Sequence, residues 1–521
     1  MDCSRDTDCL LGHSTTKYGK NYNSININIK ELSGSVPDVP TPEHEAELKP
    51  EEWYGTRHTQ CLLLFVLLSI GYAMRVNLSV GIVAMTDKTA SSNPDVPTYE
   101  WKDKSIVLSS FFWGYVVLQV LAGYCATQYG AKWFLTGSML VNSLACMGIP
   151  FMAAEFGSKG VMACRVLQGL SQGFFFPSVH GLLGQWVPTG ERSQLGTFVY
   201  SGAPFGTIVA LPLTGLISAS EWGWPVSFYL FGIVGLFWTV WWCFAGYDNP
   251  SEHPTITEQE KYYVESSLGH LKKKILPTPW KAIFTSLPMW AIVVANFGQN
   301  WGYATLLTEI PNYLHEVMGF NVKSNSLLSA APYLGYWIIS MSFGPLSDLL
   351  INRKIVTRGT SRKIFNSIGI VGPAIALTLL SYLPDDEDFL SVIVLIFAVG
   401  INGSVSSGFQ VNHIDISPNF SGILMGITNG SSNIFSIIAP LAVQVIVTDE
   451  SDKSLWRIVF LIASIIYVLS AIFFNMFASG EIQPWNNEQP IDDKKRKLSH
   501  MDNHEKYEKS TNTQPIAEEK V

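Results

Sequence analysis

A single arginine, Arg75, lies inside a long apolar segment that starts near Cys61 and runs to about residue 86. At ~1.5 Å of rise per helical residue it is roughly 21 Å from the start of the segment, near the middle of a bilayer. A cation at that depth costs about 2.5–3.5 kcal/mol on insertion scales. Neither interface is close enough for the side chain to reach water. We therefore predict that Arg75 binds an anion in a water-filled cavity.

A second arginine, Arg165, opens another apolar segment and is followed seven residues later by Gln172. Seven residues make two helical turns, so both side chains share one face of a helix. Because Arg165 stands near the end of its segment, snorkelling to the interface is the alternative to a role in the cavity. For Gln172 the alternative is a hydrogen bond between helices.

The elements that must position these residues are membrane-spanning helices. Of the 521 residues, 47% are hydrophobic and 15% charged, whereas soluble domains carry about 25% charged residues. The charge gathers at both ends and in one central stretch, which leaves uncharged blocks long enough to cross a bilayer. A nucleic-acid partner is not expected, because there is no basic stripe. Neither a catalytic triad spacing nor a metal-ligand cluster is present, so we predict no enzyme and no metal site.

Six apolar segments lie on each side of a polar stretch, which predicts an all-α multi-pass membrane protein with twelve transmembrane helices in two six-helix bundles. The segments are expected at about 60–86, 104–128, 132–154, 157–187, 193–219, 223–246, 283–314, 324–351, 363–384, 388–416, 420–448 and 456–479. The predicted domains are a disordered tail (1–59), a first bundle (60–246), a linker (247–282), a second bundle (283–479) and a second disordered tail (480–521).

Within the linker, the capping-box pattern of Thr257-Glu258-Gln259-Glu260 predicts a short amphipathic helix. Lysine and arginine are more numerous in the loops on the linker side, so the positive-inside rule places that side and both tails in the cytosol. The membrane is either the plasma membrane or that of the lysosome. The D-x-x-x-L-L pattern that ends at Leu10-Leu11 fits lysosomal sorting.

The two halves echo each other, as expected for tandem repeats. Residues of the second segment recur 221 positions later in the eighth: Gly114-Tyr115 as Gly335-Tyr336, Gly123 as Gly344, Thr127 as Asp348 and Lys132 as Arg353. This arrangement resembles the major facilitator superfamily, whose halves are parallel repeats. In that superfamily the loop after helices 2 and 8 works as a cytosolic gate latch, which implies gating roles for Asp348 and Arg353. The first-half copy has lost its acid.

Further motifs are similar to those of the anion:cation symporters, the family of sialin, the vesicular glutamate transporters and the type I sodium/phosphate cotransporters. They include Arg75-Val-Asn77-Leu-Ser79-Val, Ser110-Phe-Phe-Trp-Gly-Tyr115, Trp186-Val-Pro-Thr-Gly-Glu-Arg192 and Gly408-Phe-Gln-Val-Asn412-His413-Ile-Asp415. The pattern is closest to that of inorganic phosphate cotransporters of insects. The resemblance implies that Arg75, Asn77, Tyr115 and Arg165 bind the substrate.

Two departures from this family bear on coupling. The position of Gln172 is a glutamate implicated in proton coupling in sialin and the glutamate transporters, and an amide cannot titrate. Gln299, next to Asn300, replaces an arginine of the glutamate transporters, which disfavours a dicarboxylate substrate. Gln172, Gln299 and Asn300 are assigned to coupling or to the cavity. His413 and Asp415 are either a gate pair or packing residues at a helix end.

The sequence therefore predicts a secondary active transporter that works by alternating access. It would carry inorganic phosphate or small organic anions together with sodium or a proton, as a monomer and without a cofactor other than that cation. One alternative is a proton-coupled lysosomal exporter of acidic sugars or amino acids. A passive anion channel is the alternative of another class, and the tandem six-helix repeat disfavours it.

Overall fold

The computed structural model describes residues 50, 54–86, 88, 90–101, 103–268, 277–316, 322–383, 388–448 and 452–487. It describes their side chains except at 104, 105, 304–316, 322–330, 388, 440, 441, 444 and 453. Most of the first predicted tail, with its sorting pattern at Leu10-Leu11, and the second tail from residue 488 onward lie outside the described residues. Every regular element in the described ranges is a helix. The predicted all-α fold class is confirmed.

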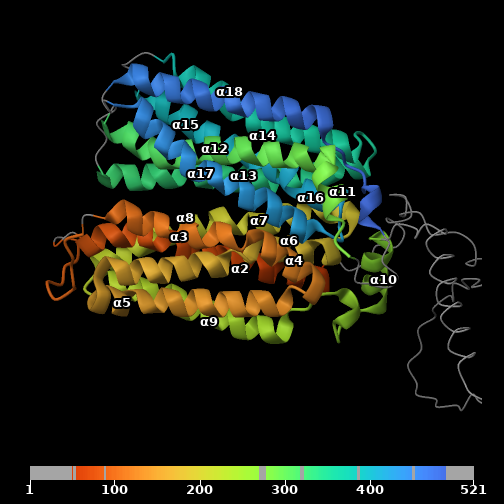
Figure 1. The fold of residues 1–521 in the computed structure, drawn as a ribbon, viewed down its shortest axis with the longest axis horizontal. Coiled ribbons are helices and arrows are strands. Elements are labelled where there is room, and N and C mark those ends of the chain that lie inside the picture. Colours follow the sequence, from red (N-terminus) through yellow and green to blue (C-terminus); the bar gives the residue numbers. More distant parts are fainter. Residues whose placement is uncertain are drawn as a thin grey trace, which may run out of the picture. The chain divides into compact units, whose positions relative to one another are not determined.

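The helices of the first half pack around one hydrophobic core, which contains large side chains such as Trp186, Trp224 and Trp238. Figure 1 shows this half in red to yellow. Its helices are α2 (Thr56–Thr86), α3 (Lys104–Val117), α4 (Gln119–Tyr129), α5 (Lys132–Gln172), α6 (Phe175–Trp186), α7 (Arg192–Tyr200), α8 (Gly202–Ala219) and α9 (Gly223–Ala245), with the short η2 (Thr189–Glu191) before α7.

The helices of the second half surround another core, which includes Trp456, Phe460 and Tyr467. In Figure 1 they run from green to blue and lie beside the first group. They are α11 (Trp280–Thr285), α12 (Leu287–Glu316), α13 (Val322–Asn352), α14 (Arg358–Leu380), α15 (Asp388–Asn402), α16 (Phe409–Ile416), α17 (Ser421–Ile446) and α18 (Lys453–Phe477), with η4 (Gly403–Ser406) between α15 and α16.

Among the described residues, eight helical segments are long and apolar enough to cross a membrane, or nine if the bent pair α3–α4 is one span. One of these segments, Lys132–Trp186, contains two passes because α5 is kinked at Gly157, whose φ of 61° favours glycine. At 30 and 26 residues, α12 and α17 are also long enough to span. Together these segments make the twelve predicted passes.

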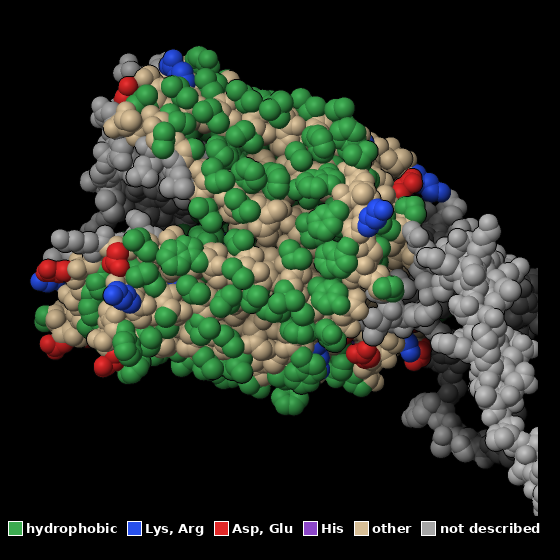
Figure 2. Space-filling model, viewed as in Figure 1, with side chains coloured by type: hydrophobic (Ala, Val, Ile, Leu, Met, Phe, Trp, Pro, Cys, Tyr) green, Lys and Arg blue, Asp and Glu red, His purple; other side chains and the backbone are tan. Residues whose placement is uncertain are grey.

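The surface agrees with a membrane-spanning protein. Figure 2 shows hydrophobic side chains over the middle of the visible face, while lysine, arginine, aspartate and glutamate gather towards its two ends. Large apolar side chains such as Phe237 and Phe244 are exposed. Exposed apolar area of this extent needs lipid rather than water as its neighbour.

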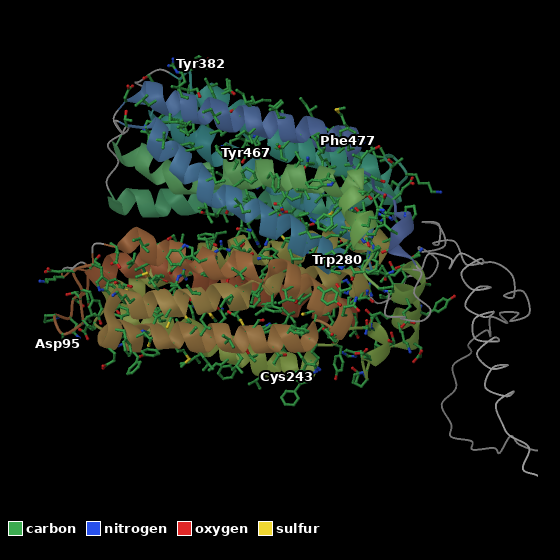
Figure 3. The ribbon with its side chains drawn as sticks, viewed as in Figure 1. Asp95, Cys243, Trp280, Tyr382, Tyr467 and Phe477 are labelled. Atoms are coloured by element: carbon green, nitrogen blue, oxygen red, sulfur yellow. The ribbon has the colours of Figure 1, made fainter. Side chains whose placement is uncertain are left out.

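The two ends of the helices are distinguished by their connections. Asp95 and Tyr382, from opposite halves, mark one end, which we call the loop end (Figure 3). The opposite end carries α10 (Glu258–Ser267), and we call it the α10 end (Figure 1). Trp280 of α11 stacks on Tyr124 of α4, so the chain that enters the second half contacts the first half on its way.

The predicted helix of the linker is present as α10. The Thr257 side chain accepts a hydrogen bond from the Glu260 backbone N–H at 3.3 Å, as the capping pattern requires. The Glu260 carboxylate instead turns to the first residues of α2, where it accepts from the backbone N–H groups of Thr56 (2.9 Å) and Arg57 (3.1 Å). A carboxylate at this position satisfies unpaired helix donors and complements the helix dipole.

Arg57 connects this contact to the rest of the first half. Its side chain is 1% exposed and donates to Glu260 at 2.9 Å and to Glu191 of η2 at 2.8 Å. Glu191 directly precedes Arg192, the first residue of α7. A buried chain of charges therefore joins the linker helix to the start of the fifth pass.

Replacing Glu260 with alanine should destabilise the protein strongly, because Arg57 and two helix N–H groups would lose a buried partner. Removal of one member of a buried ion pair costs about 3–5 kcal/mol. Thermal unfolding of the detergent-purified protein measures the effect. Glu258→Ala on the same helix is the matched control, since its side chain is exposed and lies 3.9 Å from Lys261. Equal unfolding temperatures for the two variants would contradict the proposed anchor.

Candidate functional site

Arg75 lies within a cage of aromatic side chains from α2 and α3. Its guanidinium carbon is 5.2 Å from the ring centre of Tyr72, 4.7 Å from Phe111, 5.0 Å from Phe112 and 5.1 Å from Tyr115. The residue is partly exposed. Aromatic faces attract a cation through their quadrupole, and each such contact contributes about 0.5–2 kcal/mol.

Arg165 lies deeper in the first half. It is 3% exposed, and its Nη1 donates to the backbone oxygen of Arg75 and to Oε1 of Gln168, both at 3.2 Å. Its guanidinium carbon is 4.8 Å from the centre of the Phe111 ring. The structure therefore brings the two predicted cations together, and we call Arg75 and Arg165 the arginine pair.

Among the residues whose side chains the structure describes, which do not include Glu309 of α12, neither member of the arginine pair forms an ion pair with a carboxylate. The Nε of Arg165 is buried and has no hydrogen-bond partner there. Buried cations are normally paired, because leaving one unpaired in a medium of low dielectric constant is costly. An anion could therefore bind here without first breaking an ion pair of the described residues.

The second half faces this site with hydroxyl and amide groups. The amide of Asn429 on α17 donates to the Tyr115 hydroxyl at 3.0 Å and to Oε1 of Gln119 at 3.2 Å. Tyr303 of α12 is close enough to interact electrostatically with Tyr72 and Arg75. The arginine pair thus lies where the two halves meet, which sequence repeats alone could not establish.

Two predicted site residues of the first half point elsewhere. Asn77 is buried and accepts a hydrogen bond from Thr214 of α8 at 2.8 Å. Gln172 is buried as well, and its amide donates to the Gly71 backbone oxygen at 2.9 Å and to Asn142 at 3.2 Å. Both side chains hold helices of the first half together, which is a common use of polar groups in membranes.

Two predicted residues of the second half also form hydrogen bonds between helices. Gln299 of α12 exchanges two hydrogen bonds with Asn402, at 2.6 and 2.8 Å. Asn300 donates to Asn296 at 2.8 Å and to Ser432 of α17 at 3.0 Å. These contacts link α12 to its neighbours inside the second half.

Asp348 lies at the contact between the halves near the α10 end. It is 5% exposed and accepts from the backbone N–H groups of Ser193 (3.0 Å) and Gln194 (2.6 Å) at the start of α7. A carboxylate at a helix N-terminus satisfies free donors and is stabilised by the helix dipole. Its counterpart Thr127 instead donates to Gly123 of its own helix at 2.8 Å.

Asp415 is fully buried and pairs with three arginines, of which Arg358 is the most distant at 4.0 Å. Its carboxylate accepts from Arg192 of the first half at 3.1 Å and from Arg362 of α14 at 2.6 Å. Arg362 also donates to the Ser193 hydroxyl at 2.7 Å. We call Arg192, Asp348, Arg362 and Asp415 the gate cluster, because it connects the two halves at the α10 end through buried charges.

The other two predicted gating residues lie outside the gate cluster. Nε2 of His413 is 2.8 Å from the Thr428 hydroxyl, and its ring lies 5.0 Å from that of His180 in the first half. Arg353 is exposed just beyond the end of α13. The structure therefore gives Asp415 the partners Arg192, Arg358 and Arg362 rather than His413.

Four residues of the site were not predicted from the sequence: Phe111, Arg192, Arg362 and Asn429. Arg192 and Arg362 stood at the edges of predicted segments, where a basic residue normally indicates only the cytosolic side. Their position could have indicated a role, because both arginines lie near the start of a helix at the same end of the bundle as Asp348. Phe111 and Asn429 carried no signal in a chain rich in such residues.

Comparisons with known proteins agree with this fold. Residues 61–440 and 324–501 match the family described as the Major Facilitator Superfamily. A "Putative inorganic phosphate cotransporter" of Drosophila melanogaster is 41% identical over 87% of this chain and 90% of its own length. Sialin of Ovis aries is 38% identical, over 83% of this chain and 91% of its own. The solved structure of the proton:xylose symporter XylE has a similar fold, with a TM-score of 0.63, 15% identity, and coverage of 82% of this chain and 98% of that one.

Replacing Asp348 with asparagine should favour opening of the α10 end, because the N-terminus of α7 would lose its negative charge. Such a charge contributes ~0.3–2 kcal/mol, so the ratio of open to closed protein should rise about twofold to thirtyfold. Val411, which is buried against Gly196 of the other half, can be replaced by cysteine in a background without other cysteines. Its rate of labelling by maleimide measures the opening. Thr127→Val is the control, and a rate unchanged by Asp348→Asn would contradict the gating role.

Replacing Gln172 with glutamate should destabilise the first half at neutral pH. The native amide donates to two acceptors, and an ionised carboxylate would meet both with negative charge, at a cost of about 1–3 kcal/mol. A protonated carboxyl can donate one of the two bonds, so the deficit relative to the native protein should shrink as the pH falls. The unfolding temperatures of the variant and the native protein, compared between about pH 5 and 8, check this pH dependence. If the loss of stability instead grows at low pH, Gln172 does not donate the two hydrogen bonds described here.

Proposed function

Because the chain belongs to the Major Facilitator Superfamily, we propose that it is a secondary active transporter that carries a small anion across a membrane by alternating access. The family and the fold predicted from the motifs are confirmed by the family match, the relatives and the helical architecture. The chain is a multi-pass membrane protein whose relatives include a "Putative inorganic phosphate cotransporter" and a sialin.

One observation carries the proposal: Arg75 is partly exposed at the contact between the halves and has no carboxylate partner among the described residues. A structural arginine in a membrane is expected to be paired or to reach an interface. Arg75 is held by rings instead, which attract the cation without neutralising it. The unneutralised charge supports anion binding at this point.

The gate cluster supports a conformation that is closed at the α10 end. Buried ion pairs and the cap on α7 join the halves there. For transport, these contacts break while others form towards the loop end, so that the arginine pair faces one side of the membrane at a time. With the α10 end in the cytosol, as the positive-inside rule suggests, this is the conformation that loads from the opposite side.

A co-transported cation offsets the charge of the anion. The inner-negative potential opposes anion entry by about 2.3 kcal/mol per charge per 100 mV, which a sodium ion or a proton entering with the anion removes. The substrate class is inorganic phosphate or a small organic anion, and the active unit is the monomer. Both tails lie in the cytosol, and the membrane is the plasma membrane or that of the lysosome.

Proton-coupled export from lysosomes is the second candidate, and the 38% identity to a sialin favours it. Gln172 weighs against a proton path through that position, because its amide is committed to Gly71 and Asn142 and cannot titrate. The choice between the candidates is a choice of coupling ion and direction.

Replacing Arg75 with alanine should lower gradient-driven uptake of phosphate or benzoate into proteoliposomes about a hundredfold or more. Two charge-assisted hydrogen bonds, each contributing roughly 1.5–3 kcal/mol, would be lost. Radiolabelled anions are measured with a sodium gradient and a proton gradient imposed separately, and the effective gradient identifies the coupling ion.

Lys281→Ala is the control, because this cation is exposed at α11 far from the rings around Arg75. It should keep native uptake. Uptake by Arg75→Ala at the native rate would refute the role of Arg75. If the anion never accumulates against its own electrochemical gradient, active transport is refuted and a channel is favoured.

A further inference from the structure

One aromatic ring contacts both members of the arginine pair. The Phe111 ring centre is 4.7 Å from the guanidinium carbon of Arg75 and 4.8 Å from that of Arg165. Phe112, the next residue, contacts Arg75 at 5.0 Å, and no contact of its ring with Arg165 is found among the described residues. Phe111 is therefore the ring that the two cations share.

The position of this ring is closely determined. Phe111 is fully buried, stacks on Tyr115 with ring centres 5.5 Å apart, and meets Phe112 edge to face at 5.6 Å. Its backbone lies against Gly169 of α5, where any side chain would collide with the Phe111 carbonyl oxygen. The close contact of α3 with α5 leaves the ring little freedom to move away from the arginines.

Two like charges in a medium of low dielectric constant repel each other strongly unless something negative stands near them. The described part of the chain provides no carboxylate here, and the negative faces of the rings take its place. Phe111 is the only one of these residues that serves both cations, as far as the described contacts show. Because the ring contacts both guanidinium groups, part of the space around each of them is not open to an anion.

We propose that Phe111 is a specificity-determining residue of the anion site. Its ring keeps the two guanidinium groups from closing on the same anion and offsets part of their charge, so that the site favours monovalent over divalent anions. In this arrangement Arg75 contacts the anion, and Arg165 positions Arg75 through the hydrogen bond to its backbone oxygen. This inference rests on the proposed function, because it assumes that Arg75 binds the transported anion.

Removing the ring should lower stability and also tighten anion binding, whereas loss of packing alone would only lower stability. With Phe111→Leu, the protein without anion should unfold at a lower temperature, because two cations lose a partner. Anion binding should become tighter by about twofold to thirtyfold, the range of a cation–π contact. The gain should be larger for a divalent anion, which both guanidinium groups could then reach.

The experiment measures the unfolding temperature of the detergent-purified full chain in increasing nitrate and sulfate, with gluconate added to keep the ionic strength constant. Native protein, Phe111→Leu, the matched control Phe112→Leu and Arg75→Ala are compared. A further variant carries pentafluorophenylalanine at position 111, which keeps the shape of the ring but reverses its quadrupole. This variant should bind both anions more tightly without opening space for sulfate.

The expected result is a higher ratio of sulfate to nitrate affinity in Phe111→Leu than in the native protein and in Phe112→Leu. Equal ratios in the two leucine variants, or weaker binding of both anions by Phe111→Leu, would overturn the assignment of Phe111. If Phe111→Leu does not fold, tighter anion binding by the fluorinated variant supports the proposal and unchanged binding overturns it. Anion stabilisation that persists in Arg75→Ala would instead overturn the proposed function.

Discussion

The rest of this structure depends on two guanidinium groups that lie together, neither of them paired with a carboxylate among the side chains that the structure describes. In a low-dielectric interior they can persist only if something else offsets their charge. The protein does this with aromatic faces around Arg75 and with the backbone oxygen of Arg75 beside Arg165. Because these groups attract a cation without cancelling its charge, the site stays receptive to an anion while remaining folded without one.

The contact between the halves has a different chemistry and a marked asymmetry. Both acids of the gate cluster, Asp348 and Asp415, belong to the second half, whereas the first half contributes Arg192 and the start of α7. The related position in the first half, Thr127, bonds within its own helix. A charged cap on one side alone gives the closed state a defined but limited stability, which suits an element that must open during each cycle.

The linker helix belongs to the same network. Glu260 on α10 holds Arg57, Arg57 holds Glu191, and Glu191 is followed by Arg192 of the gate cluster. A shift of α10 would therefore reach the start of the fifth pass through two buried ion pairs and the peptide bond between Glu191 and Arg192. Such contiguous charge pairs can carry a coupling between distant elements when they have two arrangements.

The sequence by itself determined the spanning segments, the place of Arg75 inside one of them and the cap of α10 at Thr257, because each follows from hydrophobic length or from spacing within one turn. Its repeats and motifs also identified the family and the two-half fold. Only the tertiary structure decided which polar residues face one another. Asn77, Gln172 and Gln299 turn into helix contacts, and Asp415 meets Arg192 from the other half. Such partners depend on how each helix is rotated against segments far away in the chain, and no local pattern encodes that rotation.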